Sequence, residues 1–162
     1  MFRVLLVRHA SFGGVNRVLA GRGGGVHLDD HGRGQADVLA AALAAEPLLA
    51  VCSSPRERAV ETAAPIAARH GLEVQVDAAF DEIDFGDWTG RSIDSLANDA
   101  TWRAFNTARS TTRVPGGERM PGVQARAVAG VLALRERHGG GSIVVVSHCD
   151  VVRSILAFAL GM

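Results

Sequence analysis

The sequence has 162 residues, of which 48% are hydrophobic and 21% charged, and these values predict a single folded domain over residues 1–162 and exclude a disordered chain. Seventeen arginines balance seventeen acidic residues, so the chain lacks the basic excess typical of a nucleic-acid-binding protein. The chain has no lysine, which excludes a Walker-type phosphate loop and a Schiff-base mechanism.

The first predicted strand is Val4–Val7, a short apolar run that is followed directly by Arg8–His9. Such a run without alternation is typical of a strand buried on both faces of a parallel sheet. It is too short for the core of a signal peptide and for a bilayer crossing. We therefore expect a cytoplasmic protein with no membrane partner.

The first predicted helix covers Gly34–Ala45, where apolar residues recur at helical spacing. The glycine-rich segment before it, Gly21–Gly25, fails the dinucleotide-binding fingerprint because Val26 and Leu28 stand where Gly or Ala is required. We interpret that segment as a loop, and we expect no organic cofactor.

A second strand is predicted over Leu48–Cys52, followed by a helix that ends near Gly71. Ser54 and Glu57 have the spacing of a capping box, and Pro55 suits the first helical position. These signals predict that the helix begins at Ser54 and carries Arg58 on its first turn.

The rest of the chain continues the alternation of strands and helices. The predicted elements are a weak strand over Glu73–Val76, a helix over Val123–Leu134, a strand over Ile143–Val146 and a helix over Val151–Ala159. Residues 77–120 are less regular, and we interpret them as an excursion over one end of the sheet. This order predicts an α/β fold, a three-layer sandwich with a mostly parallel central sheet and helices on both faces.

Polar residues follow three of the predicted strands, where an open α/β sheet binds its ligands. If these strands are neighbours, Arg8, His9, Arg58 and His148 meet at one edge of the sheet. Two guanidiniums and an imidazolium suit a phosphate monoester, and the second histidine could attack phosphorus. The N–H groups that open the helix after His148, at Cys149 and Asp150, offer a further anion site.

The reaction also needs a general acid, and the acidic residues cluster between Phe80 and Trp88. The residues alone do not decide among Asp81, Glu82, Asp84 and Asp87. An exposed acidic loop is the alternative interpretation of this cluster. The two cysteines, Cys52 and Cys149, are too few and too far apart for a disulfide framework or a zinc knuckle, and we expect no metal site.

Four motifs in the same order resemble the histidine phosphatase superfamily, the phosphoglycerate mutase-like proteins. Leu6–His9 resembles its R-H-G signature, and Cys52–Ala63 resembles its S-S-P-x-x-R-A-x-x-T-A segment. Asp81–Gly90 resembles its E-x-x-F-G-x-W-x-G segment, and Pro115–Glu118 with Val145–His148 completes the set.

The resemblance implies roles for the clustered residues. His9 is implied as the nucleophile, Glu82 as the proton donor, and Arg8, Arg58 and His148 as ligands of the phosphoryl group. It implies no metal or cofactor for the phosphatase branch.

The chain also departs from the family pattern, which bears on its substrate contacts. Phe12 stands where Thr is common, Cys149 replaces a Gly whose backbone contacts phosphate, and Ser11, Asn16 and Arg22 are the expected further substrate contacts. The chain ends at Met162, before the edge strand that family members commonly have. We interpret it as a short variant or a truncated product, and an uncovered sheet edge would favour a homo-oligomer.

These observations predict a phosphomonoester hydrolase that acts on small phosphorylated metabolites through a phosphohistidine. Phosphatase is favoured over mutase because the short chain has no room for the insertions that enclose a mutase site. The alternatives are phosphoglycerate mutase-type transfer and a catalytically weak protein that binds phosphorylated ligands. The residues do not name the substrate.

Overall fold

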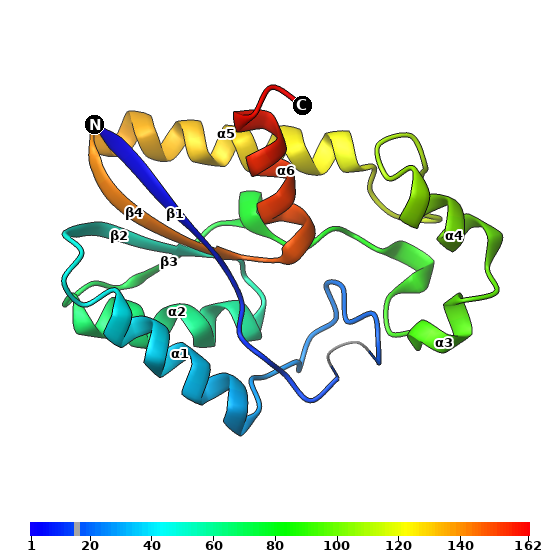
Figure 1. Ribbon diagram of the computed structural model, residues 1–162, viewed down its shortest axis with the longest axis horizontal. Coiled ribbons are helices and arrows are strands. Elements are labelled where there is room, and N and C mark those ends of the chain that lie inside the picture. Colours follow the sequence, from blue (N-terminus) through cyan, green and yellow to red (C-terminus); the bar gives the residue numbers. More distant parts are fainter. Residues whose placement is uncertain (15–16) are drawn as a thin grey trace.

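The computed structural model describes residues 1–14 and 17–162. Within them a parallel sheet of four strands has the order β1-β4-β2-β3. The strands are β1 (Phe2–Arg8), β2 (Leu48–Ser53), β3 (Val74–Val76) and β4 (Gly141–Ser147). The predicted parallel sheet is therefore confirmed, and β4, the last strand in the sequence, lies between β1 and β2 (Figure 1).

The three long strands end at the same level of the sheet. Arg8 of β1 pairs with Ser147 of β4, and Ser53 of β2 pairs with Val146 of β4. One residue further on, the N–H of His9 donates to the carbonyl of Ser147 at 2.9 Å. This register places the residues that follow β1, β2 and β4 side by side at the carboxyl edge.

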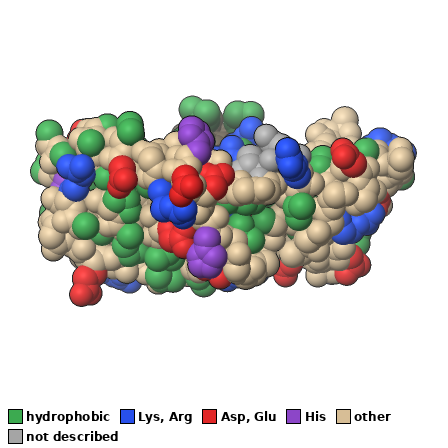
Figure 2. All heavy atoms as spheres, turned by 90° about the horizontal axis from the view of Figure 1, so that it is seen from below, with side chains coloured by type: hydrophobic (Ala, Val, Ile, Leu, Met, Phe, Trp, Pro, Cys, Tyr) green, Lys and Arg blue, Asp and Glu red, His purple; other side chains and the backbone are tan. Residues whose placement is uncertain are grey.

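Helices cover both faces of the sheet, as expected of a three-layer α/β sandwich (Figure 1). Helices α1 (Asp30–Ala42) and α2 (Glu57–Arg69) pack together on one face. Helices α5 (Met120–His138) and α6 (Cys149–Ala159) pack together on the other. Seen from below Figure 1, basic and acidic side chains are interspersed over the surface (Figure 2).

The starts of α1 and α2 differ from the prediction. Helix α1 begins at Asp30 rather than Gly34, because Asp29 caps it by accepting a hydrogen bond from the N–H of Gly32 at 2.7 Å. It ends at Ala42. Helix α2 begins at Glu57 with Arg56 as N-cap, so the predicted capping box at Ser54 is wrong.

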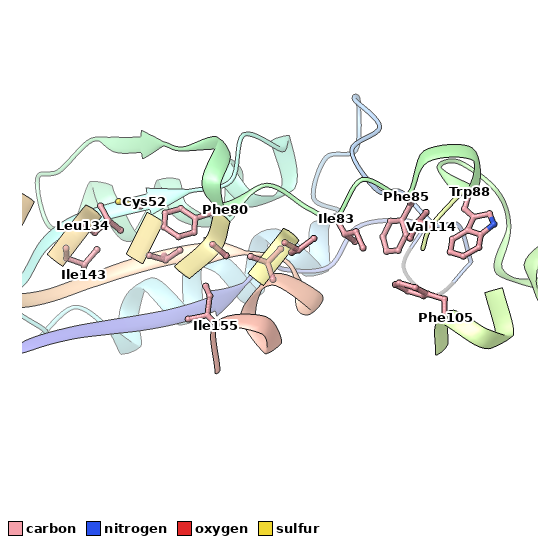
Figure 3. Packing of buried hydrophobic residues seen from close by; sticks show 14 of the residues in the cluster. Cys52, Phe80, Ile83, Phe85, Trp88, Phe105, Val114, Leu134, Ile143 and Ile155 are labelled. Carbon is pink, nitrogen blue, oxygen red and sulfur yellow. The ribbon is translucent and has the colours of Figure 1, made fainter. Parts of the chain in front are cut away.

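The excursion over residues 77–120 holds short helical turns that the prediction missed. They are η1 (Ala78–Phe80), η2 (Gly86–Trp88), α3 (Ile93–Leu96) and α4 (Ala100–Thr107). Trp88 and Phe105 are fully buried here, with ring centroids 5.7 Å apart. Figure 3 shows a row of buried side chains that runs from Ile143 on β4, past Ile83, to this aromatic cluster.

The close packing of α5 against η1 depends on Gly130. A Cβ atom at this position would lie 2.8 Å from the Cβ of Ala79 and 3.0 Å from the ring of Phe80. The absence of a side chain brings α5 close to the segment that follows η1. In the part of the chain that the structure describes, no helix combines the length and apolar character that crossing a membrane requires.

Candidate active site

A cavity of about 260 Å³ lies at the carboxyl edge of the sheet. The side chains around it come from the ends of β1, from α2, from the loop before α1 and from the excursion. Its lining includes Arg8, His9, Phe12, Arg58, Glu82 and Phe85. Residues that follow β1 and β2 thus bring cationic and imidazole groups to one cavity with the Glu82 carboxyl group, whereas His148, which follows β4, is not among the lining residues.

His9 follows β1 directly and is buried. Its Nδ1 lies 2.8 Å from the carbonyl oxygen of Ala10, and because a carbonyl can only accept, Nδ1 carries the proton. The other ring nitrogen, Nε2, then keeps its lone pair. Burial lowers the pKa of His9 to about 4, and the charges of Arg58 and Arg8 lower it in the same direction.

His148 follows β4 and is completely buried. Arg58 Nη2 donates to His148 Nδ1 at 3.2 Å, so the proton sits on Nε2, which donates to Ser54 Oγ at 2.7 Å. Burial, followed by the positive charge of Arg58, lowers the pKa of His148 well below its ordinary value. Both imidazoles are therefore neutral at neutral pH, and the fixed positive charge belongs to the arginines.

Arg58 lies on the first turn of α2 and is only 1% exposed. Its Nη2 also donates to the carbonyl oxygen of Gly21 at 2.8 Å. The other two nitrogens, Nε and Nη1, are buried and have no hydrogen-bond partner within residues 1–14 and 17–162. A buried guanidinium with free donors is suited to a bound oxyanion. Glu57 and Glu61 are acidic neighbours of Arg58 on α2 and would be its partners if it were a structural residue. Among the described contacts neither forms an ion pair with Arg58, because Glu57 bonds the N–H of Gly25 and Glu61 bonds His27.

Arg8, at the end of β1, is an exposed side chain that lines the same cavity. Its charge contributes to the lowered pKa of His9, so it lies near the imidazole. The cavity is therefore bordered by one buried and one exposed guanidinium.

Among the four acidic candidates, Glu82 alone lines this cavity. Its Oε2 lies 3.5 Å from His148 Nδ1 and 3.9 Å from Arg58 Nη2. Burial above all, together with the negative charges of Asp150 and Asp81, raises the pKa of Glu82 to about 7 against the opposing effects of the Ile83 N–H and Arg58. A carboxyl group with this pKa holds a proton near neutral pH and can donate it.

The other three acidic candidates have structural partners or face solvent. Asp81 lies 2.9 Å from Arg56 Nε and accepts a hydrogen bond from the N–H of Glu82. Asp84 accepts a hydrogen bond from the N–H of Gly86 at 2.9 Å, and Asp87 is exposed.

The expected further substrate contacts lie in different places. Ser11 lines a second, larger groove of about 1040 Å³ beside α1, which Arg8 and His9 also line, and its Oγ donates to Asp29 at 3.2 Å. Arg22 donates from Nε to the carbonyl of Glu82 at 2.8 Å, so its guanidinium is engaged by the protein. Cys149 is the first residue of α6 and is partly exposed. Asn16 lies outside the described residues.

Ser54 is a site residue, although its spacing in the sequence predicted a helix cap. Its Oγ accepts from His148 Nε2, accepts from the N–H of Arg56 at 3.3 Å, and lies 3.4 Å from Asp81 Oδ1, to which it donates. The signal was present in the sequence, because Ser54 follows a buried strand directly, as His9 and His148 do.

The arrangement combines a nucleophilic nitrogen, fixed cations with free donors and a protonated carboxyl group around one cavity. These are the components required to transfer a phosphoryl group and protonate its leaving oxygen. Over residues 1–14 and 17–162, no three His, Cys, Asp or Glu side chains are grouped as ligands for a metal ion.

Comparison with known proteins finds relatives that match nearly the whole chain. The family described as the histidine phosphatase superfamily (branch 1) matches residues 4–162. Phosphoserine phosphatase 1 of Hydrogenobacter thermophilus is 32% identical over 167 residues, which cover 100% of this chain and 78% of that protein.

Two solved structures show the similarity of the fold. A mycobacterial glucosyl-3-phosphoglycerate phosphatase is 29% identical with a TM-score of 0.89, over 99% of this chain and 80% of that chain. The protein YhfR of Bacillus stearothermophilus is 28% identical with a TM-score of 0.92, over 98% of this chain and 80% of that chain.

Proposed function

The chain belongs to branch 1 of the histidine phosphatase superfamily, and from this membership we propose that it hydrolyses phosphomonoesters of small metabolites through a phosphohistidine at His9. The observation that carries the proposal is the guanidinium of Arg58, whose buried Nε and Nη1 have no partner in the described part of the chain. A phosphoryl group offers paired oxygens that match these donors and compensates the buried charge.

In the first step, His9 Nε2 attacks phosphorus while the bond from phosphorus to the ester oxygen breaks. The hydrogen bond from Nδ1 to Ala10 supports this role, because it holds the tautomer with a free Nε2 lone pair. Arg58 and Arg8 bind the phosphoryl oxygens, and His148 supports Arg58 by accepting from its Nη2. The proton of the Glu82 carboxyl group goes to the leaving alkoxide, which departs as an alcohol.

In the second step, the Glu82 carboxylate takes a proton from a water molecule, whose oxygen attacks the phosphohistidine. The bond between phosphorus and Nε2 breaks, inorganic phosphate leaves, and both His9 and Glu82 return to their starting protonation states. The proposed cycle uses side chains of this chain alone and consumes one water.

The names of two relatives support a small substrate. One relative is named phosphoserine phosphatase and another glucosyl-3-phosphoglycerate phosphatase, and both names specify a small phosphorylated metabolite. A screen of phosphorylated metabolites for phosphate release would identify the substrate.

The test is hydrolysis of p-nitrophenyl phosphate in EDTA by the wild type and by His9→Ala. We expect turnover in the wild type and a loss of at least about 10³-fold in the variant, since removing a nucleophile leaves only binding and electrostatic catalysis. The matched control is His70→Ala, at the far end of α2 from Arg58, which should keep wild-type turnover. Normal turnover by His9→Ala would reject the proposal.

The alternatives have distinct readouts in the same experiment. A mutase would depend on a bisphosphorylated primer and would move phosphate between hydroxyl groups instead of releasing it. A binding protein without catalysis would bind phosphate or vanadate and release no phosphate from any substrate.

A further inference from the structure

The side chain of Arg126, on α5, holds the backbone of the segment that carries Glu82. Its Nη1 donates to the carbonyl oxygens of Ala79 at 2.9 Å and Asp81 at 2.7 Å, and its Nη2 donates to that of Glu82 at 3.0 Å. The same guanidinium binds Glu118 through Nε and Nη2, at 3.1 and 3.0 Å. Five hydrogen bonds to four residues use every nitrogen of the guanidinium.

Glu118 extends this network to the residues that follow Glu82. Its Oε2 accepts from the N–H of Asp84 at 2.9 Å, and its own N–H donates to the Asp84 carbonyl at 2.9 Å. Arg22 closes the network by donating from Nη2 to Glu118 Oε2 and from Nε to the Glu82 carbonyl, both at 2.8 Å. The backbone is therefore held on both sides of Glu82.

The carboxyl group of Glu82 itself is held more weakly. Its one hydrogen bond among the described residues comes from the N–H of Ile83 at 2.9 Å, and it lies 3.5 Å or more from His148 and Arg58. The place of this carboxyl group in the cavity is consequently set by its backbone.

We propose that Arg126 and Glu118 are positioning residues for proton donation, because their hydrogen bonds fix the backbone from Ala79 to Asp84 and so aim the Glu82 carboxyl group at the leaving oxygen. This inference rests on the proposed function. Neither residue lines the cavity that holds His9 and Arg58, so both act through Glu82. A displacement of about 1 Å at a reacting group can lower a rate by about 10²-fold.

The test compares two substrates that differ in their need for a proton. Phenyl phosphate releases a basic oxygen that needs the acid, whereas 2,4-dinitrophenyl phosphate releases a stable anion that does not. The variants are Arg126→Lys, which keeps the charge and loses the fork of donors, and Glu118→Gln, which keeps the shape and loses the charge. Arg135→Ala is the matched control, since Arg135 is an exposed arginine on the same helix.

We expect both variants to lose about tenfold or more in kcat/KM on phenyl phosphate, and to keep kcat/KM within about threefold of the wild type on 2,4-dinitrophenyl phosphate. The ratio kcat/KM reports the step that phosphorylates His9, before the step in which Glu82 acts as the base. Arg135→Ala should match the wild type on both. An equal loss on the two substrates, or no loss on either, would overturn the inference, because a merely structural network would not distinguish leaving groups.

Failure of the inference is separable from failure of the proposed function. Glu82→Gln should show the same dependence on the leaving group to a larger degree. If Glu82→Gln shows this dependence on the leaving group and Arg126→Lys and Glu118→Gln do not, the positioning role is wrong and the phosphatase mechanism stands. If the wild type hydrolyses neither substrate, or His9→Ala hydrolyses both normally, the proposed function itself is wrong.

Discussion

The imidazole rings of His9 and His148 lie 5.1 Å apart, centroid to centroid, at an interplanar angle of 58°. Burial lowers the pKa of each ring, and the charge of Arg58 lowers both pKa values in the same direction. The pair therefore stays neutral in mildly acidic solution. This keeps a nucleophilic nitrogen available at a pH where a buried carboxyl group is still protonated.

The opposite shifts of His9 and Glu82 predict a bell-shaped pH profile of kcat/KM. Activity should rise through about pH 4 as His9 loses its proton, and fall through about pH 7 as Glu82 loses the proton it must donate. On phenyl phosphate, which needs the acid, the wild type should show this alkaline limb, and the residual activity of Glu82→Gln should lack it. An alkaline limb that persists unchanged in Glu82→Gln would assign it to another group.

Two donors of Arg58 have no partner among the described residues. We therefore expect Arg58→Met to lose phosphate binding but to keep most of its stability. Thermal unfolding of the wild type should shift upward with added phosphate, since a ligand at about 100 times its Kd adds about 2.7 kcal/mol. The shift should vanish in Arg58→Met.

Without phosphate, the same variant should lose no more than about 1 kcal/mol in its free energy of unfolding, because an apolar side chain replaces a buried charge that is only partly satisfied. Arg69→Met, exposed at the other end of α2, is the control and should keep the full phosphate shift. A retained shift in Arg58→Met would remove this residue from the anion site.

Two adjacent buried serines separate a site contact from a structural one. Ser54 Oγ accepts from His148 Nε2 at 2.7 Å, whereas Ser53 Oγ, within the described part of the chain, donates only to the carbonyl of Ser54 at 2.9 Å. Ser54→Ala leaves a buried ring N–H without a partner, so we expect kcat/KM to fall by about tenfold and unfolding free energy by about 1–3 kcal/mol. Ser53→Ala should keep kcat/KM within about twofold. Equal kinetics in the two variants would contradict the role given to Ser54.

The parallel sheet and the meeting of three strand ends could be predicted, because both follow from local signals. The runs Val4–Val7 and Ile143–Val146 are apolar without alternation, and each leads directly into a histidine. The choice of Glu82 over its acidic neighbours came from the family resemblance. Composition and spacing do not distinguish a carboxyl group that lines a cavity from Asp87, which faces solvent.

The contacts that the sequence did not predict depend on tertiary partners. The hydroxyl of Ser54 can cap a helix or bond a histidine, and in the structure it bonds His148, which is 94 residues away in the sequence. Helices α3 and α4 are too short for a periodic pattern to emerge, and Asp99 caps α4 through local bonds. Arg126 meets its carbonyl partners only because Gly130 lets α5 approach η1 closely.

Two glycines of α1 provide the last prediction, which concerns the loop after His9. A Cβ atom on Gly32 would overlap the carbonyl oxygen of Ser11, whereas one on Gly34 would meet nothing within 4 Å. Gly32→Ala should therefore lower the free energy of unfolding by about 2–3 kcal/mol and reduce kcat/KM by displacing Ser11 from its place next to the site. Gly34→Ala should raise the free energy of unfolding by about 0.5–1 kcal/mol, since alanine favours the helix. Urea unfolding of both variants checks the difference, and a Gly32→Ala protein as stable as Gly34→Ala would show that α1 does not pack closely on this loop.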